Sequence, residues 1–203
     1  MRPMGTEQES DLRCAWDKGD YETVVTQLLQ SHARAILGIL IARLKSESDA
    51  DEVYSMFTED LSKGIKKFQW RCSLRAWAIR IALNAMMRWL TAGHRRPERN
   101  VSLEDSAVLE VADRVRSSTL AYLRSEVKSE VRRLRDELPP DEQMLLILHV
   151  DKAFKWKEVA AALADEDLAP DKLKREAARL RKQFETTVKK LRESARSRGI
   201  LDD

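Results

Sequence analysis

Apolar residues recur every three or four positions along most of this chain, and that period constrains the fold more than any other feature. Within residues 20–44 the recurring apolar positions are Val25, Leu28, Leu29, Ile36, Leu40 and Leu44. Such spacing places one apolar stripe on an α-helix and turns it toward a core. The chain has only 6 glycines and 5 prolines in 203 residues, too few for the corners of an all-β fold. We therefore predict an all-α protein.

The same period predicts the next helices and their faces. Asp20 is expected to cap helix 20–44, and Asp49 to cap a second helix that continues to Phe68. A third helix is predicted over about 74–90. Its core-facing positions are expected to be Leu74, Trp77, Ile81 and Ala85. Positions expected largely on its other faces are Arg75, Arg80, Asn84, Met87 and Arg88.

A polar segment interrupts the helical pattern at residues 91–106. It contains Gly93 and Pro97 among small polar residues, which is typical of a boundary between domains. Beyond it, further helices are predicted over 109–137, 141–150, 156–163 and 170–191.

The sequence offers little for catalysis, cofactor binding or membrane insertion. It has no glycine-rich phosphate-binding loop, and its three histidines are too dispersed to suggest a metal site. Cys14 and Cys72 suggest no disulfide framework. The longest uncharged apolar run, 35–42, is too short to cross a bilayer, and the N-terminus does not resemble a signal peptide. We expect a cytoplasmic protein that is not an enzyme, binds no cofactor, metal or small-molecule substrate, and is not inserted in a membrane.

Charge is distributed unevenly along the chain, although the formal net charge is only +3. Residues 1–60 carry 6 basic and 12 acidic side chains, whereas residues 61–100 carry 10 basic and one acidic. Residues 172–203 carry 11 basic and 5 acidic side chains. Two separate basic blocks in a nearly neutral protein indicate a polyanion bound at two places, and nucleic acid is the first candidate.

The second basic block follows a pattern typical of a helix-turn-helix. A short helix over 156–163 carries alanines that allow close packing, and a polar turn at 164–170 separates it from a basic helix that starts near Asp171. Such a helix presents its N-terminal side chains to base edges and its flanks to phosphates. An ordinary basic surface helix is the alternative.

The first basic block combines arginines with aromatic residues. Phe68 and Trp70 lie in a polar break at 68–73, and further arginines follow along the third helix. Aromatic and cationic side chains together suit unstacked bases. We expect Trp77 to pack in the core, whereas Trp70 is equally compatible with packing and with base contact.

Residues 49–84 resemble region 2 of bacterial RNA polymerase sigma factors of the extracytoplasmic-function (ECF) group. Residues 138–163 and the basic helix after them resemble region 4 of the same group. The resemblance implies two small helical domains joined by a partly flexible linker: region 2 over 15–92, the linker over 93–117 and region 4 over 118–195. Trp70 replaces a usual glycine, and the turn at 164–170 is longer than the common form.

The resemblance also implies roles for particular residues. Core-polymerase binding is assigned to Asp49, Asp51, Glu52, Ser55 and Met56, of which the last two replace a usual Gln-Glu pair. Recognition and opening of the −10 promoter element are assigned to Trp70, Arg71, Ser73, Arg75, Arg80, Asn84 and Arg88. Reading of the −35 element is assigned to Lys172, Lys174, Arg175, Arg179 and Lys182. The implied partners are core RNA polymerase, promoter DNA and an anti-sigma factor, with association with the nucleoid during initiation.

Two other functions are compatible with the residues. A stand-alone helix-turn-helix regulator would bind DNA without polymerase, but it leaves the acidic segment 49–60 and the first basic block unexplained. A helical protein-interaction module, or a protein resembling an anti-sigma partner, would use its basic blocks to bind an acidic protein.

Overall fold

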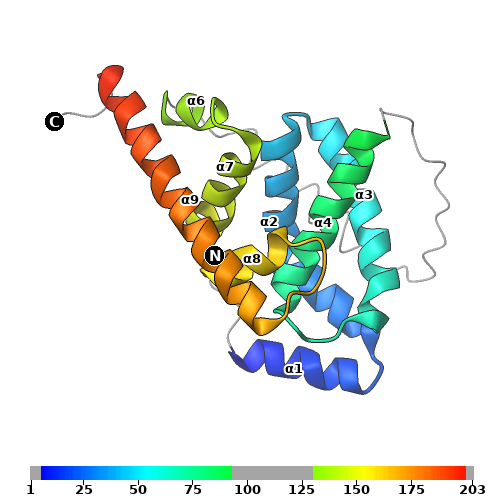
Figure 1. Ribbon diagram of the computed structural model, residues 1–203. Coiled ribbons are helices and arrows are strands. Elements are labelled where there is room, and N and C mark those ends of the chain that lie inside the picture. The colour runs from blue at the N-terminus through cyan, green and yellow to red at the C-terminus, as the bar shows by residue number, and fades with distance from the viewer. Residues whose placement is uncertain (1–5, 93–129, 200–203) are drawn as a thin grey trace.

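The computed structural model describes residues 6–92 and 130–199, and all regular elements in these ranges are helical (Figure 1). The prediction of an all-α fold is therefore confirmed. The first group of helices consists of α1 (Thr6–Asp17), α2 (Tyr21–Leu44), α3 (Glu47–Gly64), the short 3-10 helix η1 (Ile65–Lys67) and α4 (Leu74–Thr91). The second group consists of α6 (Glu130–Asp136), α7 (Pro140–Leu145), the π-helical turn η2 (Leu146–Asp151), α8 (Trp156–Leu163) and α9 (Pro170–Ser197).

Helix α2 is the central helix of the first group. The carboxylate of Asp20 caps it by accepting a hydrogen bond of 3.2 Å from the amide of Thr23, as its sequence predicts. The helix is apolar and long enough to span a bilayer by composition alone, but most of it is buried among α1, α3 and α4. It ends at Lys45, whose backbone adopts a left-handed conformation with φ of 57°.

Helix α3 begins two residues earlier than its expected cap. Its N-cap is Ser46, whose hydroxyl oxygen accepts a hydrogen bond of 3.2 Å from the amide of Asp49. The prediction that Asp49 itself is the cap was wrong, because the serine side chain reaches the free amide at the third helical position first. Asp49 therefore lies inside the first turn, where its negative charge complements the helix dipole.

The two groups of helices share one hydrophobic core. Helix α8 lies between α9 and α4 and packs against both of them (Figure 1). Buried residues of α2, α3 and α4 belong to the same cluster as Phe154, Val159 and Leu180 of the second group. The contact surface of α8 is built from small side chains, including Ala160 and Ala161, which allow helix axes to approach closely. The face of α4 that carries Arg75 and Arg80 is consequently covered by protein.

This packing corrects the predicted faces of α4. Arg75 and Arg80 were expected on faces away from the core, but only 5% and 6% of their surfaces are exposed. Trp77 and Ile81, expected in the core, are only partly buried and pack at its edge. The helical period correctly predicted that Leu74 and Ala85 are buried. It does not reveal the second buried face of α4, which packs against α8.

The second group agrees with the predicted helices in most places. Helix α8 has the predicted bounds, whereas α9 extends to Ser197, beyond the predicted end near residue 191. The helix predicted over 141–150 is formed by α7 and η2 together. Only the end of the helix predicted over 109–137 is described, as α6, and residues 93–129 lie outside the described ranges.

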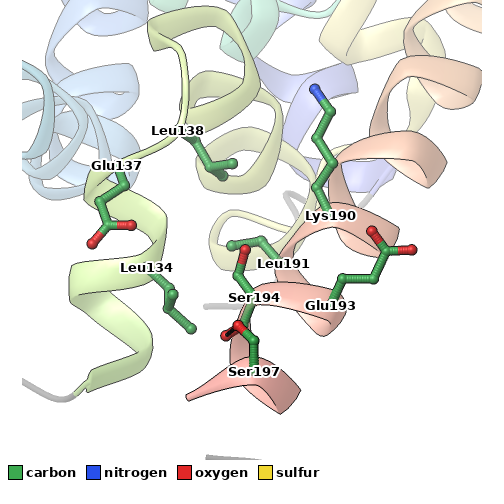
Figure 2. A pocket seen from close by; sticks show the side chains of 8 residues that line it. All are labelled: Leu134, Glu137, Leu138, Lys190, Leu191, Glu193, Ser194 and Ser197. Atoms are coloured by element: carbon green, nitrogen blue, oxygen red, sulfur yellow. Dashed lines mark hydrogen bonds between the residues drawn. The ribbon is translucent and has the colours of Figure 1, made fainter.

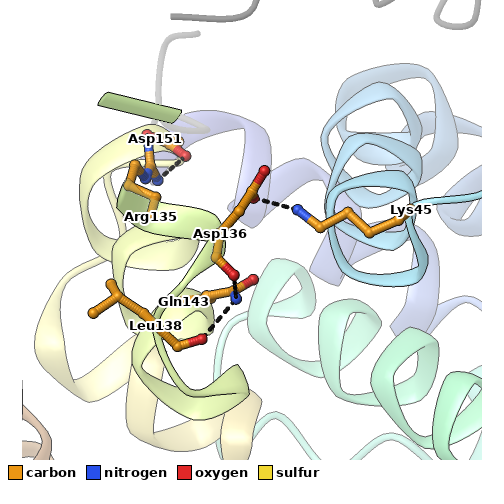
Figure 3. Close-up of polar contacts among 6 residues, drawn as sticks. All are labelled: Lys45, Arg135, Asp136, Leu138, Gln143 and Asp151. Carbon is orange, nitrogen blue, oxygen red and sulfur yellow. Dashed lines mark hydrogen bonds and ion pairs between the residues drawn. The ribbon is translucent and has the colours of Figure 1, made fainter. Parts of the chain in front are cut away.

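Polar contacts fix α6 and α7 against their neighbours (Figure 3). Asp136 forms an ion pair with Lys45 at the end of α2, and Arg135 forms one with Asp151, with 2.6 Å between Nη2 and Oδ2. The side-chain amide of Gln143 donates hydrogen bonds to the carbonyl oxygens of Asp136 and Leu138. The pair of Lys45 and Asp136 links the start of the second group to the C-terminal end of α2.

An open groove of about 490 Å³ lies between α6 and the C-terminal half of α9 (Figure 2). Leu134, Leu138 and Leu191 supply its apolar side chains. Ion pairs lie near it: Lys190 with the Glu142 carboxylate at 2.8 Å and Arg198 with the Glu137 carboxylate at 2.6 Å. These ion pairs hold the C-terminal end of α9 in place. None of the residues predicted to contact DNA or polymerase lines the groove.

Candidate nucleic-acid interface

The loop at residues 68–73, before α4, is ordered by aromatic packing. Trp70 has a left-handed backbone with φ of 55°, a conformation that glycine adopts without steric cost. Its ring packs 5.0 Å from Phe68 and 6.2 Å from Trp16, measured between centroids, and the Arg13 guanidinium lies 5.5 Å from the ring. Trp70 is therefore partly buried between the loop and α1. Of the two readings that the sequence left open, this packing describes the position of Trp70 in the free protein.

Ser73 and Arg75 contact the second group of helices. The Ser73 hydroxyl oxygen caps α4 by accepting from the Ala76 amide and lies 3.3 Å from the Glu158 carboxylate, to which it donates. The Arg75 guanidinium lies 3.7 Å from the centroid of the Phe154 ring and donates to the main-chain carbonyl of Lys152. Burial lowers the pKa of Arg75, and the nearby Glu158 carboxylate acts in the opposite direction. The cation is thus enclosed by a ring face, a carbonyl and a carboxylate.

Arg80 forms the most buried ion pair between the two groups. Its Nη2 lies 2.6 Å from Oδ1 of Asp167 in the connection between α8 and α9, and 3.4 Å from Sγ of Cys72. Only 7% of the Arg80 side chain and 26% of the Asp167 side chain are exposed. Burial of the Cys72 thiol raises its pKa, so this cysteine favours the neutral thiol. Breaking such a pair by removing one partner leaves an uncompensated buried charge.

Three other residues predicted to contact the −10 element are exposed. Arg71 lies in the loop, and Asn84 and Arg88 lie one helical turn apart on α4. Arg88 forms an ion pair with Asp60 of α3, although 55% of its side chain remains exposed. Three of the seven predicted residues are therefore exposed. Ser73, Arg75 and Arg80 are covered by α8 and its flanking segments, and Trp70 packs against α1.

The acidic residues predicted to bind polymerase lie on the N-terminal half of α3. Glu52 is exposed, and Asp49 and Asp51 are partly exposed. The Ser55 hydroxyl donates to the Asp51 carbonyl at 3.1 Å, and Met56 packs against the core edge. No group of three metal-ligating side chains occurs among the described residues.

The basic residues of α9 form a surface at its N-terminal half. Lys172, Lys174, Arg175, Arg179 and Lys182 are all exposed. Leu173, Ala177 and Leu180 lie on the opposite side and pack into the core beside α8. The helix is thus amphipathic, and its cations face solvent where a DNA duplex has access to them.

Arg179 differs from the other cations of this surface. Its guanidinium makes three hydrogen bonds to the Glu176 carboxylate, the shortest 2.6 Å from Nη2 to Oε1, and one of 3.3 Å to Gln183. These contacts raise the pKa of Arg179 and lower the pKa of Glu176. The carboxylate therefore stays ionised and competes with any phosphate that approaches Arg179.

Four residues that hold the covered set were missed by sequence reasoning. They are Lys152, Phe154, Glu158 and Asp167. The hydrogen bonds of Lys152, Glu158 and Asp167 join residues that are 77 to 87 positions apart in the sequence. No local sequence pattern therefore relates these residues to their partners. The only available signal was the long acidic turn at 164–170.

An aromatic cluster supports the helix-turn-helix from inside. The His149 ring stacks on Trp156 with centroids 3.9 Å apart, and Phe184 of α9 meets both rings edge-on. Nδ1 of His149 lies 2.8 Å from the carbonyl oxygen of Phe154. The cluster joins η2, α8 and α9, and thereby fixes the angle at which α9 leaves the core.

Comparison with known proteins identifies the first group of helices. Residues 28–96 match the model of the family described as sigma-70 region 2. The chain is also 24% identical to the RNA polymerase sigma-H factor of Pseudomonas aeruginosa over 161 residues, which cover 77% of this chain and 83% of that protein. No solved structure matches the chain.

These matches support a sigma factor of the sigma-70 family. Sigma factors act in transcription initiation and bind DNA. The apolar helix α2 is consistent with this class, because its apolar surface is used in the core.

Proposed function

We propose that this protein is an ECF-type sigma factor that binds core RNA polymerase and directs it to a class of promoters. The single observation that carries this proposal is the occurrence, in one chain, of a region 2 match over 28–96 and a basic helix-turn-helix formed by α8 and α9. A sigma factor that holds two promoter elements needs two nucleic-acid surfaces, and the chain has two basic blocks in those places.

The proposed division of labour follows from the chemistry of each surface. The exposed cations of α9 contact duplex DNA at the −35 element, and each phosphate contact makes binding more sensitive to salt. Arg71, Asn84 and the covered arginines of α4 engage the −10 strand as it separates. Unstacking a base step costs a few kcal/mol, and capture of the freed bases offsets this cost.

The acidic surface of α3 is proposed to contact core polymerase. Glu52→Lys reverses one exposed charge there and is expected to weaken polymerase association about tenfold, because like charges at an interface repel. Glu22→Lys is the matched control, since it makes the same reversal at an exposed position on α2. Equal weakening by both variants would argue against a specific contact through α3.

The function is tested by co-purification with core RNA polymerase, followed by transcription from genomic DNA fragments in vitro. Stable association and new start sites support the proposal and reveal the promoter sequences. Tight DNA binding without polymerase association would instead favour a stand-alone helix-turn-helix regulator. Capture of an acidic protein in place of polymerase would favour an interaction module. An anti-sigma factor would be distinguished from such a partner because the protein freed from it would still bind core polymerase.

A further inference from the structure

The described structure places a specific set of groups over Arg75 and Arg80 at the N-terminal part of α4. Asp167 contacts Arg80, the Phe154 ring and the Lys152 carbonyl contact Arg75, and Glu158 accepts from Ser73. These contacts all come from α8 and the two segments that flank it. They leave Arg75 and Arg80 about one-twentieth exposed in the free chain.

Each covering group resembles a group that a nucleic acid strand presents. A carboxylate carries negative charge and accepts from guanidinium as a phosphate does, and a ring face stacks on guanidinium as a base does. A carbonyl oxygen accepts a hydrogen bond as a base edge does. The two arginines therefore have their nucleic-acid-like partners supplied from within the chain.

The Asp167 carboxylate differs from the neighbouring carboxylates because it faces the interior of the protein. The connection between α8 and α9 carries three acidic residues in succession, Asp165, Glu166 and Asp167. The first two are exposed, whereas the third is turned inward and pairs with Arg80 at 2.6 Å. One carboxylate of this turn thus has a defined partner inside the molecule, and its neighbours provide internal controls.

We propose that this is a closed state, in which α8 and its flanking segments occupy the face of α4 that a single DNA strand would bind, and that Asp167 is its main polar latch. The inference rests on the proposed function, since the strand concerned is that of an opening promoter. Closed and DNA-bound states exclude one another, because Arg80 has either the carboxylate or a phosphate as its partner. The apparent dissociation constant for the strand equals the intrinsic one divided by the open fraction.

The first test measures binding of a fluorescent single-stranded oligonucleotide to the full-length protein by anisotropy. Asp167→Asn leaves Arg80 buried without its countercharge, so the open fraction should rise and the apparent affinity should increase about tenfold. Asp165→Asn changes the net charge equally from an exposed position and should change affinity less than about twofold. Asp167→Glu retains the charge and should stay near the original affinity.

Equal tightening by Asp167→Asn and Asp165→Asn would overturn the latch, because general charge would then explain both. Unchanged binding of Asp167→Asn would overturn it as well. Asp165 is exposed and Asp167 is partly exposed, so neither substitution is expected to unfold the protein. Circular dichroism verifies that each variant remains folded.

The second test measures opening itself. Spin labels at Ser48 and Lys189, both exposed, report the separation of α3 and α9 when both native cysteines are replaced by serine. We expect a narrow distance distribution that broadens to longer distances in Asp167→Asn and after addition of the oligonucleotide. A distribution that stays narrow in both cases would show that the helices do not separate and would overturn the proposal.

Association of the same variants with core polymerase separates the two hypotheses. If the protein associates with polymerase but the Asp167 variants behave like the controls, the closed state is wrong and the sigma function stands. If the variants open and bind DNA as expected without polymerase association, the latch stands and the sigma function fails.

Discussion

The indole Nε1 of Trp16 donates a hydrogen bond of 2.9 Å to the main-chain carbonyl of Ile65, which joins α1 to the turn after α3. The same ring meets Tyr21 and Trp70 edge-on, with centroids 6.0 and 6.2 Å away. Trp16 thus connects the N-terminal helix to the loop that precedes α4. A helix that carries none of the predicted functional residues therefore supports the candidate −10 surface.

Replacement of Trp16 tests this support. Trp16→Phe removes the hydrogen bond but keeps a ring, and should lower the free energy of unfolding by about 1 kcal/mol. Trp16→Ala also removes the ring contacts and should cost about 3 kcal/mol. Urea unfolding measures both changes. Asp17→Ala, at an exposed neighbouring position, should stay within about 0.5 kcal/mol of the original protein, and a larger loss there would point to a general effect of α1.

Trp70→Gly sets backbone strain against packing. Glycine would relieve the left-handed conformation by about 1 kcal/mol, but the contacts with Phe68, Trp16 and Arg13 would be lost. We expect a net destabilisation of about 1–2 kcal/mol, because the packing loss is the larger contribution. Thermal unfolding measures it, with Gln69→Gly as the exposed control from the same loop. A net gain in stability would mean that Trp70 is retained for something other than packing.

His32 should make stability depend on pH. Burial and the positive charge of Arg75 lower its pKa from 6.5 to about 4. Between these values the unfolded chain binds a proton that the folded chain does not, so stability falls as pH falls through this window. The contribution of His32 should fall by about 2 kcal/mol between pH 7.5 and pH 5.

Denaturant unfolding of the original protein and His32→Leu across this range measures the effect. Leucine does not titrate, so the variant should lose less stability on acidification. Parallel losses in the two proteins would assign the acid sensitivity to other groups.

The contacts of Arg179 predict an unusual gain of affinity. Glu176→Gln removes the carboxylate that engages Arg179, so affinity for duplex DNA should rise several-fold and the salt dependence should steepen. Arg175→Ala should weaken binding about tenfold and reduce the salt slope by about one. Arg192→Ala serves as the matched control, because it removes an exposed arginine from the other half of α9. Titrations at several salt concentrations distinguish these outcomes, and an equal loss for Arg192 would refute a localised surface.

Sequence reasoning succeeded where the determinants were local. The cap at Asp20 and the bounds of α8 follow from a side chain and its near neighbours, and both agree with the structure. The all-α class follows from the helical period and the shortage of turn residues. The basic surface of α9 was likewise visible, because its cations and its apolar stripe alternate within one helix.

The candidate site was less predictable because its geometry depends on distant contacts. A helical period assigns arginines to solvent, and it cannot foresee that Phe154 and Asp167 will cover Arg75 and Arg80. Helix α1 has a weak apolar stripe and derives its place from Trp16 and Leu12, which meet a core built later in the chain. The predicted roles of individual residues in DNA and polymerase binding stay predictions.

The core shared by α4 and α8 has a calorimetric consequence. Burial of apolar surface lowers heat capacity, and its exposure raises it. If a DNA strand displaces α8 from α4, the complex gains one interface while the protein loses another. The heat-capacity change on binding should therefore be less negative than the buried protein–DNA surface alone would give. Titration calorimetry over a range of temperatures measures this heat-capacity change. Separation of α8 from α4 would appear as the difference between the measured value and the value expected from the buried protein–DNA surface.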